Sequence, residues 1–392
     1  MKNLKVMTGT LGLLAGGCAT SWGIGTGGLI HDGHVDCGIQ FINGQWVAGY
    51  THETNSNPLD PNAPAQGHRL SMESTVLVAR DQPFETGSRV LRPVGGPWDF
   101  IGVDAAAPLW WFPQTNWPQG NYVGFTISGP FARYQESDHR LAGSGPEKWG
   151  RINSVSLQYR GKGEGHFSVW TNSTSSGLKV WVNSSDGFQP GDRYFVGDNG
   201  HGHPAFGFSS LGLYRIGFQG RAWLDVEQTE EVVSPVYPSY VAVGTYAIWI
   251  AERFSPQRWF QDEVSGDLGD PDNDGVPNLM EYACGLDPRE PDAGREADGT
   301  TPGMPRLNVT EDGSVFVTTL QRAAASNPQL LYRWETAPNP QSMEWAELLP
   351  LARDTASEGW ETVVYAMPKA GPQQPSHFGR LRVELLGSIA YP

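Results

Sequence analysis

The sequence predicts a mainly β protein in which two β-sandwich domains are joined by a short helical segment. Short runs of alternating apolar and polar residues recur about every 10 to 20 residues, which is the pattern of half-buried, antiparallel strands. Glycine and proline, 49 and 30 of the 392 residues, separate these runs and mark turns. Between His34 and Val226 no long helical periodicity interrupts the pattern, so the first domain is expected to be all β.

Residues 1–19 have the composition of an export signal. The stretch MKNLK carries two lysines, the short apolar run VMTGTLGLLAGG follows, and small residues surround Cys18. Because this run is too short to remain as a spanning helix, we expect an exported mature chain without a transmembrane helix, located extracellularly or at the cell surface. Ala15 to Cys18 also fit a lipoprotein cleavage box, so a lipid anchor at Cys18 and ordinary cleavage after Ala19 both stay open.

Composition narrows the class of partner. The formal net charge of −15 argues against nucleic acid, because no stripe of Lys and Arg is present to replace the counterions of phosphates.

Once Cys18 is removed or lipidated, Cys37 and Cys284 are the remaining cysteines. In an oxidising compartment they either form a disulfide or stay as two buried thiols.

Residues 20–230 are expected to form the first domain, a β-sandwich or jelly roll. Its core is expected to consist of aromatic residues and Val, Leu and Ile at the inward positions of each strand. The alternating runs are HVDCGIQF, QWVAGY, STVLVA, NYVGFTI, NSVSLQY, HFSVWT, KVWVN and LYRIGF.

Residues 231–295 contain a helix and then a loop whose polar residues have calcium-binding spacing. The run YAIWIAERF, which begins at Tyr246, has apolar side chains at helical spacing. The loop after it supplies oxygen ligands at alternate positions, a glycine at the sharp turn and a final glutamate that can give two oxygens. The predicted ligands of this EF-hand-like calcium loop are Asp270, Asp272, Asp274, the Val276 carbonyl, Asn278 and Glu281, with Gly275 at the turn. We therefore predict one bound Ca²⁺, without which the clustered carboxylates repel one another.

The chain from YAIWIAERF to NLMEYACGLDP resembles the single calcium-loop segment, of thrombospondin type 3 or dockerin-like kind, of many exported bacterial proteins. In those relatives the segment is a rigid spacer or mount, which implies a structural calcium and no catalysis. A dockerin uses two such loops to grip its partner, whereas one is recognisable in this sequence. The resemblance therefore implies a rigid structural spacer more than a module that docks to a partner protein.

Residues 296–392 are expected to form a small fibronectin-like β-sandwich after a polar linker at 287–305. Four alternating runs, SVFVTTLQR, LLYRWETA, WETVVYAM and HFGRLRVEL, supply its strands. The stretches LLYRWETAPNPQSMEW and FGRLRV are similar to the C-terminal β module that often follows a single calcium loop in exported bacterial proteins. That similarity implies an accessory domain.

Histidines concentrate in the first domain and indicate a second metal site. Eight of the nine histidines lie at or before His203. In an extended strand His201 and His203 project from the same face about 7 Å apart, so both can reach one ion. Asp36 stands in the same relation to His34. The alternative is that these side chains satisfy turn backbones and one another.

The first domain also resembles a known family across residues 28–227. The stretches GHVDCGIQF, PLWWFPQ, GHFSVWT, SSDGF and HGHPAFGFSSLGLYRIGF occur in the order found in the surface-anchored protein domain of the choice-of-anchor M type. The resemblance implies an exported β domain at a cell surface, in some members encoded beside metal-uptake transporters. Its polar positions match His34, Asp36, His201 and His203. His52 stands where relatives carry two histidines, one of which is Tyr50 here. Such a set would suit Zn²⁺ or another transition metal, among them Cu, Ni, Mn and Fe.

Motifs for catalysis are weak in this sequence. The stretches GFSSLG and AGSG miss the Gly-x-Ser-x-Gly pattern, and no glutamate follows His203 at the spacing of a cupin metal motif. Trp110, Trp111 and Trp117 either line a glycan platform or pack in the core. We expect a bacterial cell-surface binding or structural protein, not an enzyme, with a partner in the cell envelope or at the surface. The alternative is a carbohydrate-binding module or a metal-dependent or carbohydrate-active enzyme.

Overall fold

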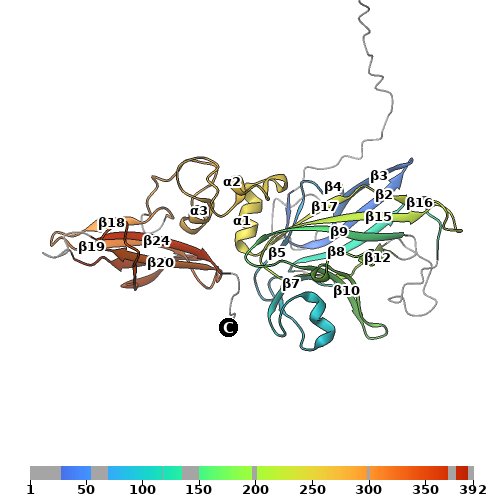
Figure 1. The fold of residues 1–392 in the computed structure, drawn as a ribbon, viewed down its shortest axis with the longest axis horizontal. Helices are drawn as coiled ribbons and strands as arrows, with labels where there is room; N and C mark the ends of the chain where they lie inside the picture. The colour runs from blue at the N-terminus through green and yellow to red at the C-terminus, as the bar shows by residue number, and fades with distance from the viewer. Residues whose placement is uncertain are drawn as a thin grey trace, which may run out of the picture.

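The structure is a computed structural model that describes residues 28–53, 69–117, 119–134, 150–196, 201–297, 301–369 and 377–386. It confirms the mainly β class: an N-terminal and a C-terminal β body lie on either side of three short α-helices (Figure 1). Within the described residues, no helix is both long and apolar enough to cross a membrane. The predicted export signal and Cys18 lie outside the described residues.

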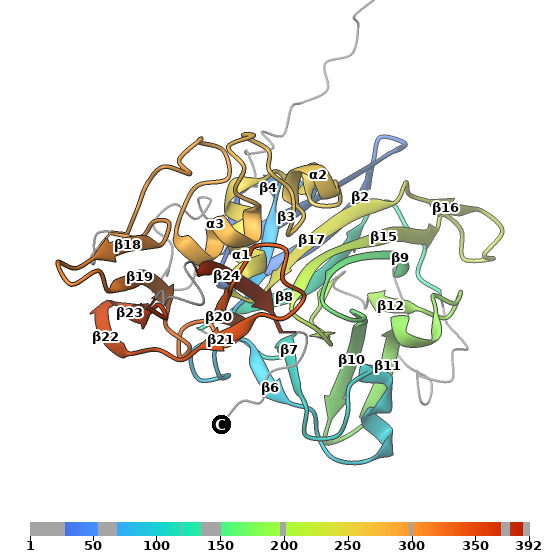
Figure 2. The same ribbon diagram turned by 60° about the vertical axis from the view of Figure 1, so that its left-hand side comes forward.

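Three sheets build the N-terminal body (Figure 2). The seven-stranded sheet has the order β1 (Leu29–Ile30), β5 (Val76–Ala79), β17 (Tyr237–Val243), β15 (Gly212–Trp223), β9 (Gly150–Gly161) and β12 (Arg193–Val196), with β16 (Glu231–Val233) paired to β15. A five-stranded sheet has the order β11 (Gly177–Asn183), β10 (Phe167–Ser173), β14 (Ala205–Phe208), β7 (Pro108–Phe112) and β6 (Arg89–Leu91). The third sheet has the order β13 (His201–Gly202), β8 (Asn121–Ser128), β2 (Gly33–Ile42), β3 (Gln45–Glu53) and β4 (Arg69–Leu70).

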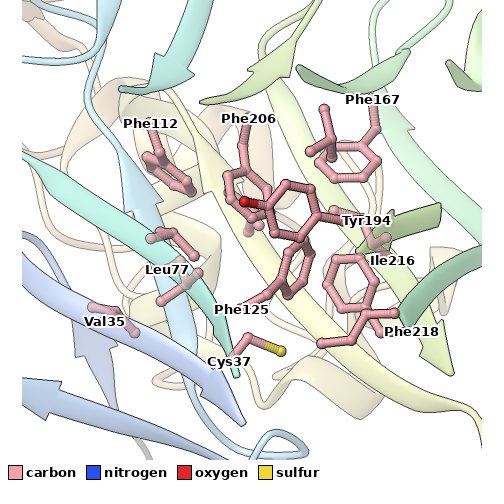
Figure 3. Packing of buried hydrophobic residues seen from close by; sticks show 14 of the residues in the cluster. Val35, Cys37, Leu77, Phe112, Phe125, Phe167, Tyr194, Phe206, Ile216 and Phe218 are labelled. Atoms are coloured by element: carbon pink, nitrogen blue, oxygen red, sulfur yellow. The ribbon is translucent and has the colours of Figure 1, made fainter. Parts of the chain in front are cut away.

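All three sheets contribute to one core. Figure 3 shows Phe125 between residues of the other two sheets, with Phe206 and Phe218 beside it. Along β2 the alternation of side chains puts Val35 and Cys37 into this core, at 0% and 1% exposure. The residues that alternate with them, His34 and Asp36, therefore face away from the core.

Two features of the N-terminal body differ from the prediction. The expected pattern was antiparallel, but β2 pairs with β8, and β5 with both β1 and β17, in parallel. Parallel pairing requires a long crossover, and here the chain between β2 and β8 forms β3 and β4 of the same sheet and three strands of the other sheets, β5, β6 and β7. The sheet also extends past residue 230, the predicted boundary, because β16 and β17 both pair with β15.

The segment between the two bodies contains three short α-helices, of which the helical periodicity predicted the first. It consists of α1 (Thr245–Arg253), α2 (Asp262–Ser265) and α3 (Asn278–Cys284). Gly285 ends α3 in the left-handed region, at a φ of 70° that favours glycine. Short 3₁₀ turns also occur at η1 (Gly96–Ile101), η2 (Ser184–Asp186) and η3 (Pro256–Arg258).

Two sheets form the C-terminal sandwich. One has the order β18 (Arg306–Val309), β19 (Val315–Arg322), β23 (Trp360–Ala366) and β22 (Ala352–Ser357). The other has the order β21 (Ala346–Leu348), β20 (Leu330–Ala337) and β24 (Phe378–Leu385). Val317 and Val363 from the first sheet pack with Trp334 from the second, which closes a core between them.

Candidate metal centres

The third sheet of the N-terminal body brings four predicted ligands together. In the parallel register of β2 and β8, His34 lies opposite Tyr122 and Asp36 opposite Gly124. Strand β13 pairs with the other edge of β8 and places His201 opposite Thr126. Paired residues point to the same face of a sheet, so side chains from three adjacent strands meet on its outward face.

The ligand atoms of these four side chains converge. All four offer an atom within 4.8 Å of the other three. His203 Nε2 lies 2.7 Å from His201 Nε2 and 3.1 Å from His34 Nε2. Asp36 Oδ1 lies 2.9, 3.4 and 3.8 Å from the Nε2 atoms of His201, His34 and His203, respectively. For metal–nitrogen bonds of about 2.0 to 2.1 Å, ligand atoms around one ion stand about 3 Å apart, so the group fits a transition metal.

The shifted pKa values of Asp36 and His203 favour cation binding at neutral pH. Burial alone would raise the pKa of Asp36, but its contacts with His201 and His34 outweigh burial and hold that pKa well below its ordinary value. Burial, followed by the neighbouring His201, lowers the pKa of His203 to about 4. At neutral pH the site therefore contains a carboxylate and a neutral His203, the ionisation states that bind metals.

His52 does not join this group, contrary to the prediction. In the antiparallel register of β2 and β3 it lies opposite Val35, on the core side of the sheet. Its side chain is fully buried, and its Nε2 lies 3.0 Å from the Asp32 carbonyl oxygen. The register thus places His52 on the opposite face of the sheet from His34 and Asp36.

The acidic loop brings three of its predicted ligands close together. Asp270, Asp272 and Asp274 offer carboxylate oxygens within 4.8 Å of one another. The Asp274 amide donates to Asp270 Oδ1 and Asp272 Oδ1, each at 3.2 Å, and the Gly275 amide donates to Asp270 Oδ2 at 3.0 Å. Gly275 has a φ of 91°, which explains why a glycine stands at this turn.

The other predicted ligands of the loop lie against it. The Val276 amide donates to Asp274 Oδ1 at 2.9 Å, and a role for the Val276 carbonyl stays a prediction. Asn278 is fully buried and donates from Nδ2 to the carbonyls of Val264 and Gly266, at 2.9 and 2.8 Å. Its Oδ1 is buried and has no hydrogen-bond partner within the described part of the chain.

Among the loop residues, Glu281 has the surroundings that most favour a cation. Its side chain is fully buried, and neither carboxylate oxygen has a hydrogen-bond partner among the described residues. Burial, with repulsion from Asp272 and Asp274, raises the pKa of Glu281 to about 8. A buried carboxylate without a donor is costly, and a divalent cation removes that cost.

Sequence reasoning missed one acidic residue of this centre. Asp292 offers a carboxylate oxygen within 4.8 Å of Asp274 and Glu281. Neither of its oxygens makes a hydrogen bond to the described residues, although Arg295 Nη1 lies 3.1 Å from Oδ2. The next amide, that of Ala293, donates to Asp274 Oδ2 at 2.7 Å and ties the linker to the loop. Because Asp292 lies outside the twelve-residue ligand spacing, that spacing could not reveal it.

The three tryptophans pack against other residues of the N-terminal body, and the cysteines are buried. Trp110 is 4% exposed and donates to Asp81 Oδ1 at 2.9 Å, and Trp111 lies on the opposite face of β7. Trp117 and Trp111 both contact Phe84, with ring centroids 4.3 and 5.5 Å apart, whereas Trp110 is buried, so the three tryptophans do not form one platform. Within the described residues the cysteines are two free, buried thiols in different clusters, Cys37 and Cys284.

Comparison of the chain with models of known protein families and with curated proteins finds no match.

Proposed function

We propose that this chain is an exported bacterial cell-surface protein with a binding or structural role and two kinds of metal site. The outward face of the N-terminal body binds one transition metal ion through His34, Asp36, His201 and His203. The loop between the bodies binds calcium and fixes them to one another. Export and surface location rest on the N-terminal sequence and on the family resemblance.

The observation that carries the transition-metal role is the convergence of three imidazole Nε2 atoms and one carboxylate oxygen. His203 Nε2 faces the Nε2 atoms of both His201 and His34, at 2.7 and 3.1 Å, and one N–H can serve only one of these two contacts, so a cation accounts for the convergence better than hydrogen bonds alone. The four side chains are between 13% and 32% exposed, so an ion can reach them from solvent.

The experiment is to strip the purified full-length chain with a chelator and titrate it with Zn²⁺, Cu²⁺, Ni²⁺ and Mn²⁺ in a calcium-containing buffer. We expect one equivalent of a transition metal, measured by calorimetry and by elemental analysis after desalting. If wild-type protein takes up calcium alone, the transition-metal role is wrong.

Contacts on both sides of α3 support the calcium role. Toward the C-terminal sandwich, Arg322 Nε donates to the Tyr282 carbonyl at 2.7 Å, and the Tyr332 hydroxyl donates to the Ala283 carbonyl at 2.8 Å. Both carbonyls belong to residues that directly follow the ligand Glu281. A cation that holds Glu281 therefore also holds the surface on which the C-terminal sandwich sits.

Contacts toward the N-terminal body complete this connection. Through its Nδ2 bonds, Asn278 holds the turn after α2. Arg160 of β9 pairs with Asp262 of α2, and Lys162, directly after β9, has its Nζ 3.2 Å from Asp267 Oδ2. Because the same turn contacts the calcium loop and the N-terminal body, we propose that calcium sets the arrangement of the two bodies. Small-angle scattering with and without calcium tests this. An unchanged scattering profile would contradict the proposed effect of calcium on the arrangement of the two bodies.

A further inference from the structure

Strand β8 contributes two residues beside the histidine group that carry no ligand atom for it. Tyr122 and Gly124 lie opposite His34 and Asp36, in the middle of the outward face. Their neighbours on the other side are the histidines on and after β13. Any side chain at these two positions therefore decides how much room the ligands have.

Because Gly124 has no side chain, it leaves room for the ligands Asp36 and His203. A Cβ atom at this position would lie 2.3 Å from Asp36 Oδ1, 2.6 Å from His203 Cε1 and 2.9 Å from His203 Nδ1. Real Cβ contacts are essentially never shorter than 3.0 Å, so Asp36 and His203 would both have to move. Gly124 does not have a positive φ, so the backbone conformation does not demand a glycine here. The close approach of the two ligands is what explains it.

Tyr122 controls the plane of His203. Their rings are stacked, with centroids 3.9 Å apart and an interplanar angle of 12°. The same tyrosine contacts His34 with centroids 5.3 Å apart. Because a flat ring on one side limits rotation of the imidazole, His203 Nε2 stays directed at His34 and His201. Residues that orient metal ligands in this way contribute about 10- to 100-fold to metal affinity.

We propose that Gly124 and Tyr122 are positioning residues of the transition-metal site, Gly124 by leaving room for Asp36 and His203, and Tyr122 by fixing the plane of the His203 ring. The site is thereby preformed on a rigid sheet before any ion arrives. This inference rests on the proposed transition-metal role, since it names the residues that build the site for that ion.

The test compares binding of Zn²⁺ and of Co²⁺ by chelator-stripped, full-length variants. Gly124→Ala should weaken binding about 10- to 100-fold and change the visible spectrum of bound Co²⁺, which reports the arrangement of the ligands. The matched control is Gly120→Ala, just before the same strand, where a Cβ meets no atom closer than 3.6 Å. That control should bind like wild type, and all variants should keep their calcium.

A second pair of variants tests the same proposal in case Gly124→Ala does not fold. Tyr122→Phe keeps the ring and should bind like wild type, whereas Tyr122→Leu removes the flat surface and should bind more weakly. Equal Zn²⁺ affinity and equal Co²⁺ spectra in wild type, Gly124→Ala and Tyr122→Leu would overturn the positioning role. A wild-type chain that binds neither ion would instead overturn the proposed transition-metal role itself.

Discussion

Asp292 lies beside Glu281: a carboxylate oxygen of each lies within 4.8 Å of the other and of Asp274. Glu281 belongs to α3, whereas Asp292 belongs to the polar linker that leads to the C-terminal sandwich. The proposed calcium centre thus includes a residue from beyond the loop, and an ion there would hold helix, loop and linker at once.

Calcium should stabilise the wild-type chain and not Glu281→Ala. With a dissociation constant of about 0.1 to 1 mM, 10 mM calcium adds about 1.4 to 2.7 kcal/mol to the free energy of unfolding. Asp292→Asn should lose part of this gain. Asp312→Asn, in an exposed turn of the C-terminal sandwich, should keep all of it. Melting curves with calcium and with EDTA measure the gain, and an equal gain in wild type and Glu281→Ala would mean that the loop is not occupied.

The calcium-free protein should lose stability as the pH rises. Glu281 has a pKa of about 8 in the fold against an ordinary value of 4.5. Below pH 4.5 it is protonated in both states, and between the two values the unfolded chain gains more by ionising. Its contribution is therefore lost progressively up to about pH 8. Urea unfolding in EDTA from pH 5 to 9 should show a steeper decline for wild type than for Glu281→Gln, and parallel curves would contradict this.

The double change His201→Ala, His203→Ala should abolish stoichiometric transition-metal binding while calcium uptake continues. It removes two of the four converging ligands, and even outer partners of metal ligands contribute about 10- to 100-fold to affinity. His52→Ala should keep the metal and lose stability instead, because His52 is buried on the other face. Elemental analysis of wild type, the double variant and His52→Ala measures this. Loss of metal in His52→Ala would mean that His52 is a ligand after all.

Protons should compete with the transition metal for the imidazoles. Binding is expected to weaken as the pH falls, and for His203 the competition with protons centres on its lowered pKa of about 4, since a protonated imidazole cannot act as a ligand. Titrations between pH 4 and 8 measure this. Affinity that does not change over this range would contradict imidazole ligands.

Arg322→Ala should loosen the C-terminal sandwich from the helical segment. The guanidinium lies over the rings of Tyr282 and Trp360, at 4.1 and 4.7 Å from their centroids, and donates to the Tyr282 carbonyl. Losing these contacts should cost about 1 to 3 kcal/mol. Arg353→Ala removes an exposed ion pair and should change little. Calorimetry should resolve two separated melting transitions in Arg322→Ala, and one unaltered transition would speak against the connection.

Much of the fold could be predicted because its information is local. Strand alternation in runs such as NYVGFTI and LLYRWETA, and the ligand spacing from Asp270 to Glu281, each depend on residues close together in sequence. The same locality let the spacing of His201 and His203 indicate a shared ion.

The remaining features depend on strand register and on chain beyond the motif. The register of β2 against β3 sent His52 to the core, and no local pattern specifies that pairing. Gly124 and Asp292 are likewise recognisable only once distant segments are packed together. Parallel pairing of β2 with β8 escaped prediction for the same reason.

The two metal centres differ in the order in which a folding chain can complete them. Glu281 and the aspartates of the calcium loop are near neighbours in sequence, so loop closure there is fast. His34 and His203 are 169 positions apart, and their meeting requires β2, β8 and β13 to be aligned. Contacts of such high sequence separation form late and slowly. A chain that leaves the cell unfolded would therefore carry no ion at the histidines, and would acquire it only where folding ends.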